Sequence, residues 1–255
     1  MISFLAELAK RDLSERFAGS ILGTTWAFIW PAVQLFIYIV IFGRIIGSKL
    51  PGTNQIYSYG IYVAAGLIPW TSFCNVVSRS TGIFLEKKHI ISKIRVSLHS
   101  FPLFIVLSEA VIFVFSMAVL IAVAFLTGLK IPLSKILFLP FLYYIQQIFA
   151  FSIGLFFATF TVFLRDIKEV VDIILQLWFW FTPIVYIETI LPAWVKRFVH
   201  LNTMYVFIST YHRIFILPGA IDFFSLFVMN SIAHFFFFLS VFFLKTFEKD
   251  VRDFL

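Results

Sequence analysis

The sequence predicts an all-α polytopic membrane protein with six transmembrane helices, an N-terminal amphipathic interface helix, and short external re-entrant or surface helices between spans 5 and 6. Its 255 residues are 61% hydrophobic and 13% charged, whereas soluble domains are about 45–50% apolar and about 25% charged. Thirty-six phenylalanines and a mean hydropathy of +1.00 exceed what one globular core can bury. Lipid is therefore the expected solvent.

Six apolar stretches approach or exceed the roughly 20 residues that a helix needs to cross a bilayer. They occupy residues 24–46, 59–78, 101–126, 136–164, 170–186 and 223–244. The fourth is longer than required and contains Pro140, Gln146 and Gln147, so we expect it to tilt, bend or begin outside the hydrocarbon. The fifth is the shortest, and Asp172 and Gln176 interrupt it. We expect residues 1–255 to form a single transmembrane domain.

Basic residues give the expected orientation. Six spans place both termini on one side, and thirteen Lys and Arg residues fall on that side against seven on the other. The positive-inside rule then makes both termini cytoplasmic. The net charge of +7 is spread over short connections and forms no reading helix, so we expect no nucleic-acid partner. The first 20 residues are too charged for a signal peptide, and the single Cys74 excludes an intrachain disulfide.

Residues 2–17 carry apolar and charged side chains on opposite faces at helical spacing. We predict an amphipathic helix lying in the membrane interface. A simple anchor and a docking surface for a soluble partner are equally compatible with this pattern. The residues assigned to this interface are Leu5, Leu8, Lys10, Arg11, Asp12 and Arg16.

Residues 86–98 form the longest connection on the side of the termini and combine basic residues with a narrow apolar stripe. A connection that only sets topology would need the charges but not the stripe, so we predict a short helix that docks a partner. The residues assigned to it are Glu86, Lys87, Lys88, His89, Ile90, Ile91, Lys93, Ile94 and Arg95.

On the opposite side, residues 187–222 are too long for a turn and too apolar for a solvated loop. We predict short helices that re-enter the membrane or lie on its face, because non-helical backbone at membrane depth needs support from protein or a water-filled cavity. This segment is a candidate external gate.

Aromatic and polar residues recur along two helix faces, on the first and the fifth expected span. Rings with a polar edge suit sugars, which are apolar on one face and hydroxylated at the rim. The alternative interpretation is interfacial aromatics and helix packing. The residues of this candidate pathway are Trp26, Trp30, Gln34 and Tyr38 on the first span, and Asp172, Gln176, Phe179 and Pro183 on the fifth.

Neither a phosphate-binding GxxxxGK[ST] motif nor HExxH, CxxC or GxSxG is present. We therefore expect no catalysis, metal site or cofactor in this chain. Buried ionisable groups are often functional in membranes, but Glu109 and His234 are interpreted as helix-pairing groups. A ridge of small residues, Ala150, Gly154 and Ala158, permits close helix approach within one chain or between two.

Several short motifs, in order, make the chain resemble the membrane-spanning subunits of bacterial ATP-binding-cassette exporters of O-antigen, capsule and teichoic-acid polysaccharides. Two positions depart from that family's pattern: Ser97 replaces a proline, and Asn202-Thr203 replaces Asn-Pro. The motifs are Lys10-Arg11-Asp12-Leu13, Arg16-Phe17-Ala18-Gly19-Ser20, Leu22-Gly23 with Trp26 and Pro31, Gly66-Leu67-Ile68-Pro69-Trp70, Arg165-Asp166-Ile167 and Pro183-Ile184-Val185-Tyr186.

The resemblance implies a bacterial inner-membrane protein that works as two copies with two cytoplasmic ATPase subunits, which bind ATP and Mg²⁺. It implies that residues 86–98 are a coupling helix and that residues 2–17 lie beside it. The implied substrate is a polysaccharide on a polyprenyl diphosphate, with O-antigen preferred. Lys10, Arg11 and Arg16 would attract the diphosphate or ordinary lipid head groups.

Three alternatives predict different features. An exporter of a drug or small lipid shares the layout but needs no wide channel. A membrane enzyme acting on polyprenyl-linked sugars would gather acidic or histidine residues at one membrane face. A secondary carrier would show an internal repeat with polar breaks at the midplane. The sequence has neither such a cluster nor a convincing repeat.

Overall fold

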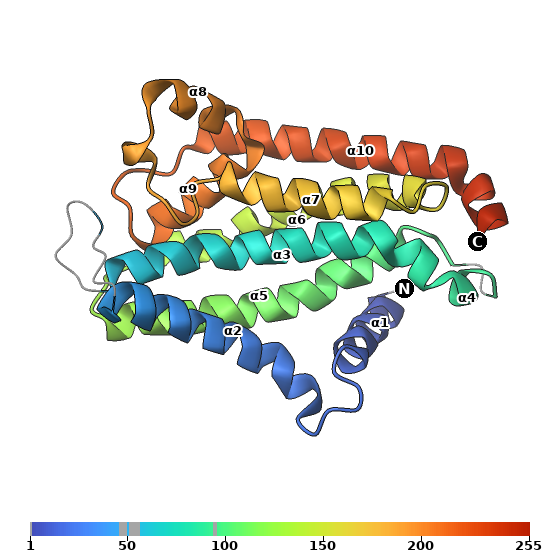
Figure 1. The fold of residues 1–255 in the computed structure, drawn as a ribbon, viewed down its shortest axis with the longest axis horizontal. Helices are drawn as coiled ribbons and strands as arrows, with labels where there is room; N and C mark the ends of the chain where they lie inside the picture. The colour runs from blue at the N-terminus through green and yellow to red at the C-terminus, as the bar shows by residue number, and fades with distance from the viewer. Residues whose placement is uncertain (1, 46–49, 51–56, 94–95) are drawn as a thin grey trace.

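The computed structural model describes residues 2–45, 50, 57–93 and 96–255, and this part of the chain forms helices and no strand (Figure 1). Five helical segments are long and apolar enough to cross a membrane. They are Gly23–Ile41, Ser58–Glu86, Ser100–Leu126, Leu133–Thr161 and Phe223–Phe254.

The long helices run roughly alongside one another, and the shorter elements gather at the two ends of the bundle (Figure 1). At one end lie α1, α4 and the C-terminus; at the other lie α8 and α9. The helices are α1 (Ile2–Glu15), α2 (Trp26–Ile37), α3 (Ser58–Glu86), α4 (Lys88–Ile91), α5 (Ser100–Leu126), α6 (Leu133–Thr161), α7 (Ile167–Trp180), α8 (Ala193–Leu201), α9 (Thr203–Phe215) and α10 (Phe223–Phe254), with shorter η1 (Gly23–Thr25), η2 (Tyr38–Ile45, a π-helix) and η3 (Glu188–Ile190).

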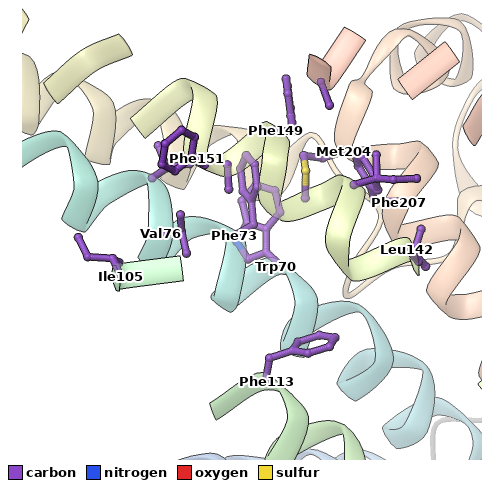
Figure 2. Packing of buried hydrophobic residues seen from close by; sticks show 14 of the residues in the cluster. Trp70, Phe73, Val76, Ile105, Phe113, Leu142, Phe149, Phe151, Met204 and Phe207 are labelled. Atoms are coloured by element: carbon purple, nitrogen blue, oxygen red, sulfur yellow. The ribbon is translucent and has the colours of Figure 1, made fainter. Parts of the chain in front are cut away.

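The core is built around α3, which packs against α5, α6, α7 and α9. Figure 2 shows Trp70 and Phe73 of α3 beside Phe149 of α6, and the rings of Phe73 and Phe149 lie 6.0 Å apart. A Cβ atom on Gly154 would lie 2.6 Å from Cβ of Ser80, so only glycine permits this approach of α6 to α3. The ridge of small residues on α6 is thus used within one chain.

The fifth expected span, 170–186, is helical only from Ile167 to Trp180. Fourteen residues reach about 21 Å at about 1.5 Å each, which is less than the roughly 30 Å of hydrocarbon. The helix ends before Pro183, which has no N–H to donate and disfavours helical geometry in the preceding Thr182. Among the described residues there are therefore five helices of spanning length where the sequence predicted six.

Other helices run beyond their expected ends. The second span was expected to stop at residue 78, but α3 continues to Glu86, and the last span was expected to stop at 244, but α10 continues to Phe254. Charged side chains such as Arg79 and Arg252 end the apolar run without ending the helix, because acidic partners satisfy them. The expected helix over 86–98 is divided: Glu86 belongs to α3, and α4 has four residues.

Candidate functional site

A partly buried cluster of charges joins α1 to α3 and α5. The carboxylate of Glu109 on α5 is 1% exposed and accepts from Arg16 Nη2 at 2.6 Å and from Arg79 Nη1 at 3.1 Å. Asp12 of α1 pairs with both arginines, at 3.0 Å to Arg16. Asn75 of α3 donates to the second Glu109 oxygen at 3.1 Å. Two arginines and two acids neutralise one another, as buried charges must.

This cluster holds α1 against the bundle. Leu5 and Ala9 are buried, and α1 packs against α5. Arg16 follows the last helical residue and enters the cluster, whereas Lys10 is exposed and Arg11 pairs with Glu15 at 2.6 Å. The predicted interface residues thus divide into those that fix α1 to the bundle and those that face outward.

The basic connection after α3 is divided in the same way. Lys87 pairs with Glu15 of α1 at 3.0 Å, and Glu86 pairs with Lys168 of α7 at 3.1 Å. Lys88 and His89 are exposed.

The apolar residues of this connection point into the bundle, since Ile91 and Leu98 are buried. Ile90 is half-buried, and Lys93 is exposed like Lys88. Ile94 and Arg95, which were also assigned to the connection, lie outside the described residues. Lys88, His89 and Lys93 remain as the outward basic surface.

The two pathway stripes lie on either side of α3. In Figure 1, α2 and α7 flank α3, which contacts both α7 and the continuation of α2 in η2. On α2, Trp30 and Gln34 are exposed, while Trp26 and Tyr38 are half-buried. The α7 stripe is divided similarly, with Gln176 exposed, Asp172 and Phe179 half-buried, and Pro183 buried in the turn that follows.

A polar face of α3 borders the α2 stripe. Thr71, Asn75 and Ser78 recur at spacings of four and three residues, which places them on one face of the helix. Thr71 and Asn75 line a cavity of about 60 Å³ together with Gln34 and Tyr38 of α2. The same surface continues to Arg79.

Sequence reasoning missed this face and the role of Arg79. Thr71, Asn75, Ser78 and Arg79 were each inconspicuous, and only their shared spacing inside an apolar run could have indicated a polar stripe. Glu109 was expected to pair with another helix, and it pairs with Arg79 of α3. His234 bonds to the Asn230 carbonyl of its own helix rather than to a neighbouring one.

At the opposite end, Asn202 joins three elements. Its side-chain oxygen accepts from Met204 N at 3.0 Å, which caps α9, and from Trp178 Nε1 of α7 at 2.7 Å. Its amide donates to Thr182 Oγ1 at 2.8 Å. The asparagine therefore fixes the α8–α9 turn to the end of α7 without the usual proline behind it.

The second helix of the expected external gate, α9, is packed into the bundle. Tyr62 of α3 stacks on His212 of α9 with ring centroids 3.8 Å apart, and Tyr211 donates to Gln146 of α6 at 3.1 Å. A Cβ atom on Gly66 would lie 2.7 Å from His212 Nε2, so α9 needs glycine at this position of α3. α9 is therefore part of the core, whereas Trp194, Phe198 and Leu201 of α8 are exposed.

A small acidic site lies at the edge of this segment. Glu188 accepts from Tyr205 at 2.5 Å and bonds to His200 at 2.6 Å. Partial burial opposes ionisation of Glu188, but hydrogen bonds from Tyr205 and His200 outweigh it and hold the pKa of Glu188 below its ordinary value. Among the described residues no group of three His, Cys, Asp or Glu side chains is placed to hold a metal ion.

Comparisons with known proteins agree with this architecture. The chain is similar to the O-antigen export system permease protein RfbA of Klebsiella pneumoniae, with 28% identity over 84% of this chain and 81% of the relative. It is 25% identical to the RfbA protein of Myxococcus xanthus over 83% of this chain and 79% of the relative.

A third relative carries a different name. The polysialic acid transport protein KpsM of Escherichia coli is 23% identical over 78% of this chain and 86% of the relative. The family model described as ABC-2 type transporter matches residues 4–216. The chain therefore belongs to the ABC-2 type transporter family of membrane proteins.

Proposed function

We propose that this chain is the channel-forming membrane subunit of an ATP-driven exporter that moves a polyprenyl-diphosphate-linked polysaccharide, O-antigen in the first place, from cytoplasm to periplasm. The observation that carries the proposal is similarity over about four-fifths of the chain to permeases named for O-antigen export. The third relative, named for polysialic acid transport, supports a polysaccharide rather than a drug or small lipid.

The proposed arrangement is a multi-pass protein of the bacterial inner membrane with both termini in the cytoplasm. Basic residues favour this orientation, since Lys88, Lys93 and Lys245 all lie at the end that carries α1. The helix α7 and the turn after it make the sixth crossing. Its exposed apolar residues Ile173, Leu177 and Trp180 would be covered by lipid or by a second copy of the chain.

The substrate pathway is the surface made by the stripe of α2, the polar face of α3 and the stripe of α7, closed by the same surface of the second copy. Trp30 and Trp180 offer exposed rings, and Gln34, Asn75 and Gln176 offer hydrogen-bonding groups between them. This mixture suits the apolar face and hydroxylated rim of a sugar ring. Residues 187–222 close the periplasmic end.

ATP and Mg²⁺ are bound by two separate ATPase subunits, which dock on the exposed Lys88, His89 and Lys93. Movement of this surface reaches α1 through Lys87 and Glu15, and reaches α7 through Glu86 and Lys168. α1 and α7 are thereby both connected to the short segment at the end of α3. ATP binding would shift them together and part the two copies.

The export function is tested by deleting the gene in its host, restoring it, and measuring surface O-antigen by immunoblotting in each case. Cells without the chain should retain lipid-linked glycan inside, and the wild-type gene should restore export. Trp30→Ala with Gln176→Ala should reduce the longest glycans about tenfold. Phe235→Ala, an equally exposed ring on α10, is the matched control.

Unchanged surface glycan in cells that lack the gene would refute the proposal. Equal export by the Trp30/Gln176 variant and the Phe235 variant, at equal protein levels, would remove the pathway assignment alone. Loss of resistance to a small amphiphile with normal glycan export would favour the drug or small-lipid alternative.

A further inference from the structure

A groove with a volume of about 560 Å³ lies between α5, α6 and α10, on helices that carry neither pathway stripe. Cavities of about 300–1,000 Å³ are the size that holds small ligands. α6 forms the floor, since it packs against both α5 and α10. The rings of Phe151 on α6 and Phe237 on α10 lie 5.8 Å apart where floor and wall meet.

Each helix contributes one straight stripe to the groove. On α10 the lining residues Phe237, Val241 and Lys245 are four residues apart, which aligns them along a single face. Tyr144 and Ile148 of α6 have the same spacing. The groove therefore runs along the bundle and has the elongated shape of a hydrocarbon chain.

Charge is confined to one end of this apolar groove. Lys245 and His99 line the end nearest α1, and both are exposed. Within the part of the chain that the structure describes, Lys245 makes no ion pair. The neighbouring Arg252 is occupied by Glu248 at 2.9 Å and by the Val96 carbonyl at 2.7 Å.

We propose that this groove is a binding site for an anionic glycerophospholipid of the surrounding membrane. The phosphate lies at Lys245 and His99, and an acyl chain lies along Val241 and Ile148. Basic pockets between transmembrane helices bind anionic lipid head groups in this way, and burial of the chain adds an apolar contribution. The site needs only that the helices lie in a bilayer, so it does not depend on the proposed export function.

Phe151 and Phe237 pack against each other on only one side of the groove. The acyl chain would fill the remaining space between the helices, which no side chain occupies. We therefore expect the bound lipid to stabilise α10 against the rest of the bundle.

The test is native mass spectrometry of the purified full-length chain, titrated with phosphatidylglycerol or with phosphatidylcholine of the same chain length. Wild-type protein should retain one phosphatidylglycerol at least fivefold more tightly than phosphatidylcholine. Lys245→Gln should lower the phosphatidylglycerol affinity about fivefold, as expected for one basic residue near an anionic lipid. Lys130→Gln is the control, because Lys130 is exposed, lies beyond the other end of α5 and does not line the groove.

A second variant tests the chain rather than the charge. Val241→Trp fills the groove and should abolish retention of either lipid, while the protein keeps its monodisperse elution. Equal retention of the two lipids by wild type would overturn the proposal, as would equal losses from Lys245→Gln and Lys130→Gln. Displacement of phosphatidylglycerol by undecaprenyl phosphate at tenfold lower concentration would also overturn it, because the groove would then belong to the isoprenoid carrier.

Discussion

At the α1 end of the bundle the helices are joined by charged side chains, whereas at the α8–α9 end the interior contacts are neutral hydrogen bonds and stacked rings. Arg16, Asp12, Arg79 and Glu109 form the first kind of junction. Tyr62 on His212, and Tyr211 on Gln146, represent the second kind.

The two ends differ in whether their contacts can re-form with other partners. Ion pairs can be remade with other charges, such as those of an ATPase surface or a phosphate-bearing lipid. A stacked ring between two helices has no such substitute and is lost only when the helices separate. The α1 end is therefore suited to receive a signal, and the α8–α9 end is suited to stay closed.

The largest expected effect comes from breaking the charge cluster. Glu109→Gln leaves Arg16 and Arg79 with one carboxylate instead of two. Removing one partner of a fully buried ion pair costs about 3–5 kcal/mol, and the partial exposure of both arginines reduces this cost. We expect lower yield and a strongly reduced melting temperature in detergent. Glu7→Gln, an exposed acid on α1, should leave both unchanged. Equal melting of these two variants would mean that the cluster does not fix α1.

The neutral end is tested at the contact between α3 and α9. Gly66→Ala puts a Cβ atom 2.7 Å from His212 Nε2 and 3.2 Å from Ile184 Cγ2, and overpacking of this kind costs about 1–3 kcal/mol. Adding His212→Ala should recover part of that loss, because the two residues are in contact. Thermal unfolding of the two single variants and the double variant measures the coupling. Simple additivity would contradict the close approach.

The edge of the α8–α9 end should respond to acid. Because the pKa of Glu188 is lowered in the folded protein, its stabilisation is complete above the ordinary carboxyl pKa and is lost as pH falls through the lower, folded value. Hydrogen bonds to a charged group contribute about 1.5–3 kcal/mol when shielded, and partial exposure reduces this. Glu188→Gln should therefore melt a few degrees lower at pH 7. The difference should shrink as the pH falls below about 4.3, the ordinary value for a glutamate, and should vanish only below the lowered pKa of the folded protein. A constant difference across this range would exclude the carboxylate as its cause.

The smallest effect on stability, and the most specific one, separates two adjacent lysines. Lys88→Glu should release the ATPase in co-purification with no change in melting, because Lys88 is exposed. Lys87→Glu should lower stability by less than about 1 kcal/mol through its partly exposed pair with Glu15. Glu15→Lys in the same chain should restore only part of this loss, because the new lysine then faces Arg11. Retention of the ATPase by Lys88→Glu would move the docking surface elsewhere.

The sequence predicted the long helices well where apolar length decides their extent, as in α5 and α6. It stopped α3 eight residues early because Arg79 and Glu86 read as the end of a span, and their partners lie far away in the chain. Asp12 and Arg16 were identified as interface residues, but Glu109 is 93 residues beyond Arg16. Which distant residue completes an ion pair is decided by the packing of helices, which periodicity in one segment does not encode.

The short α7 shows a different limit. Its apolar residues continue past Trp180 to Tyr186, so composition alone extends the span, while Pro183 and the hydrogen bonds of Asn202 end it. The polar face of α3 was hidden for the opposite reason, because Thr71, Asn75 and Ser78 are too few to interrupt an apolar run. A count of apolar residues over a whole span hides the few polar positions that would line a pathway.

The close approach of Gly154 to Ser80 holds α6 against α3 at a point where a further Cβ atom would not fit. The ion pairs of Arg79 lie near one end of α3, and the α9 contact of Gly66 lies near the other. α3 alone is about 43 Å long at about 1.5 Å for each of its 29 residues. A shift imposed at Glu86 would therefore be carried along α3 to its contact with α9, so one helix links the two ends of the bundle.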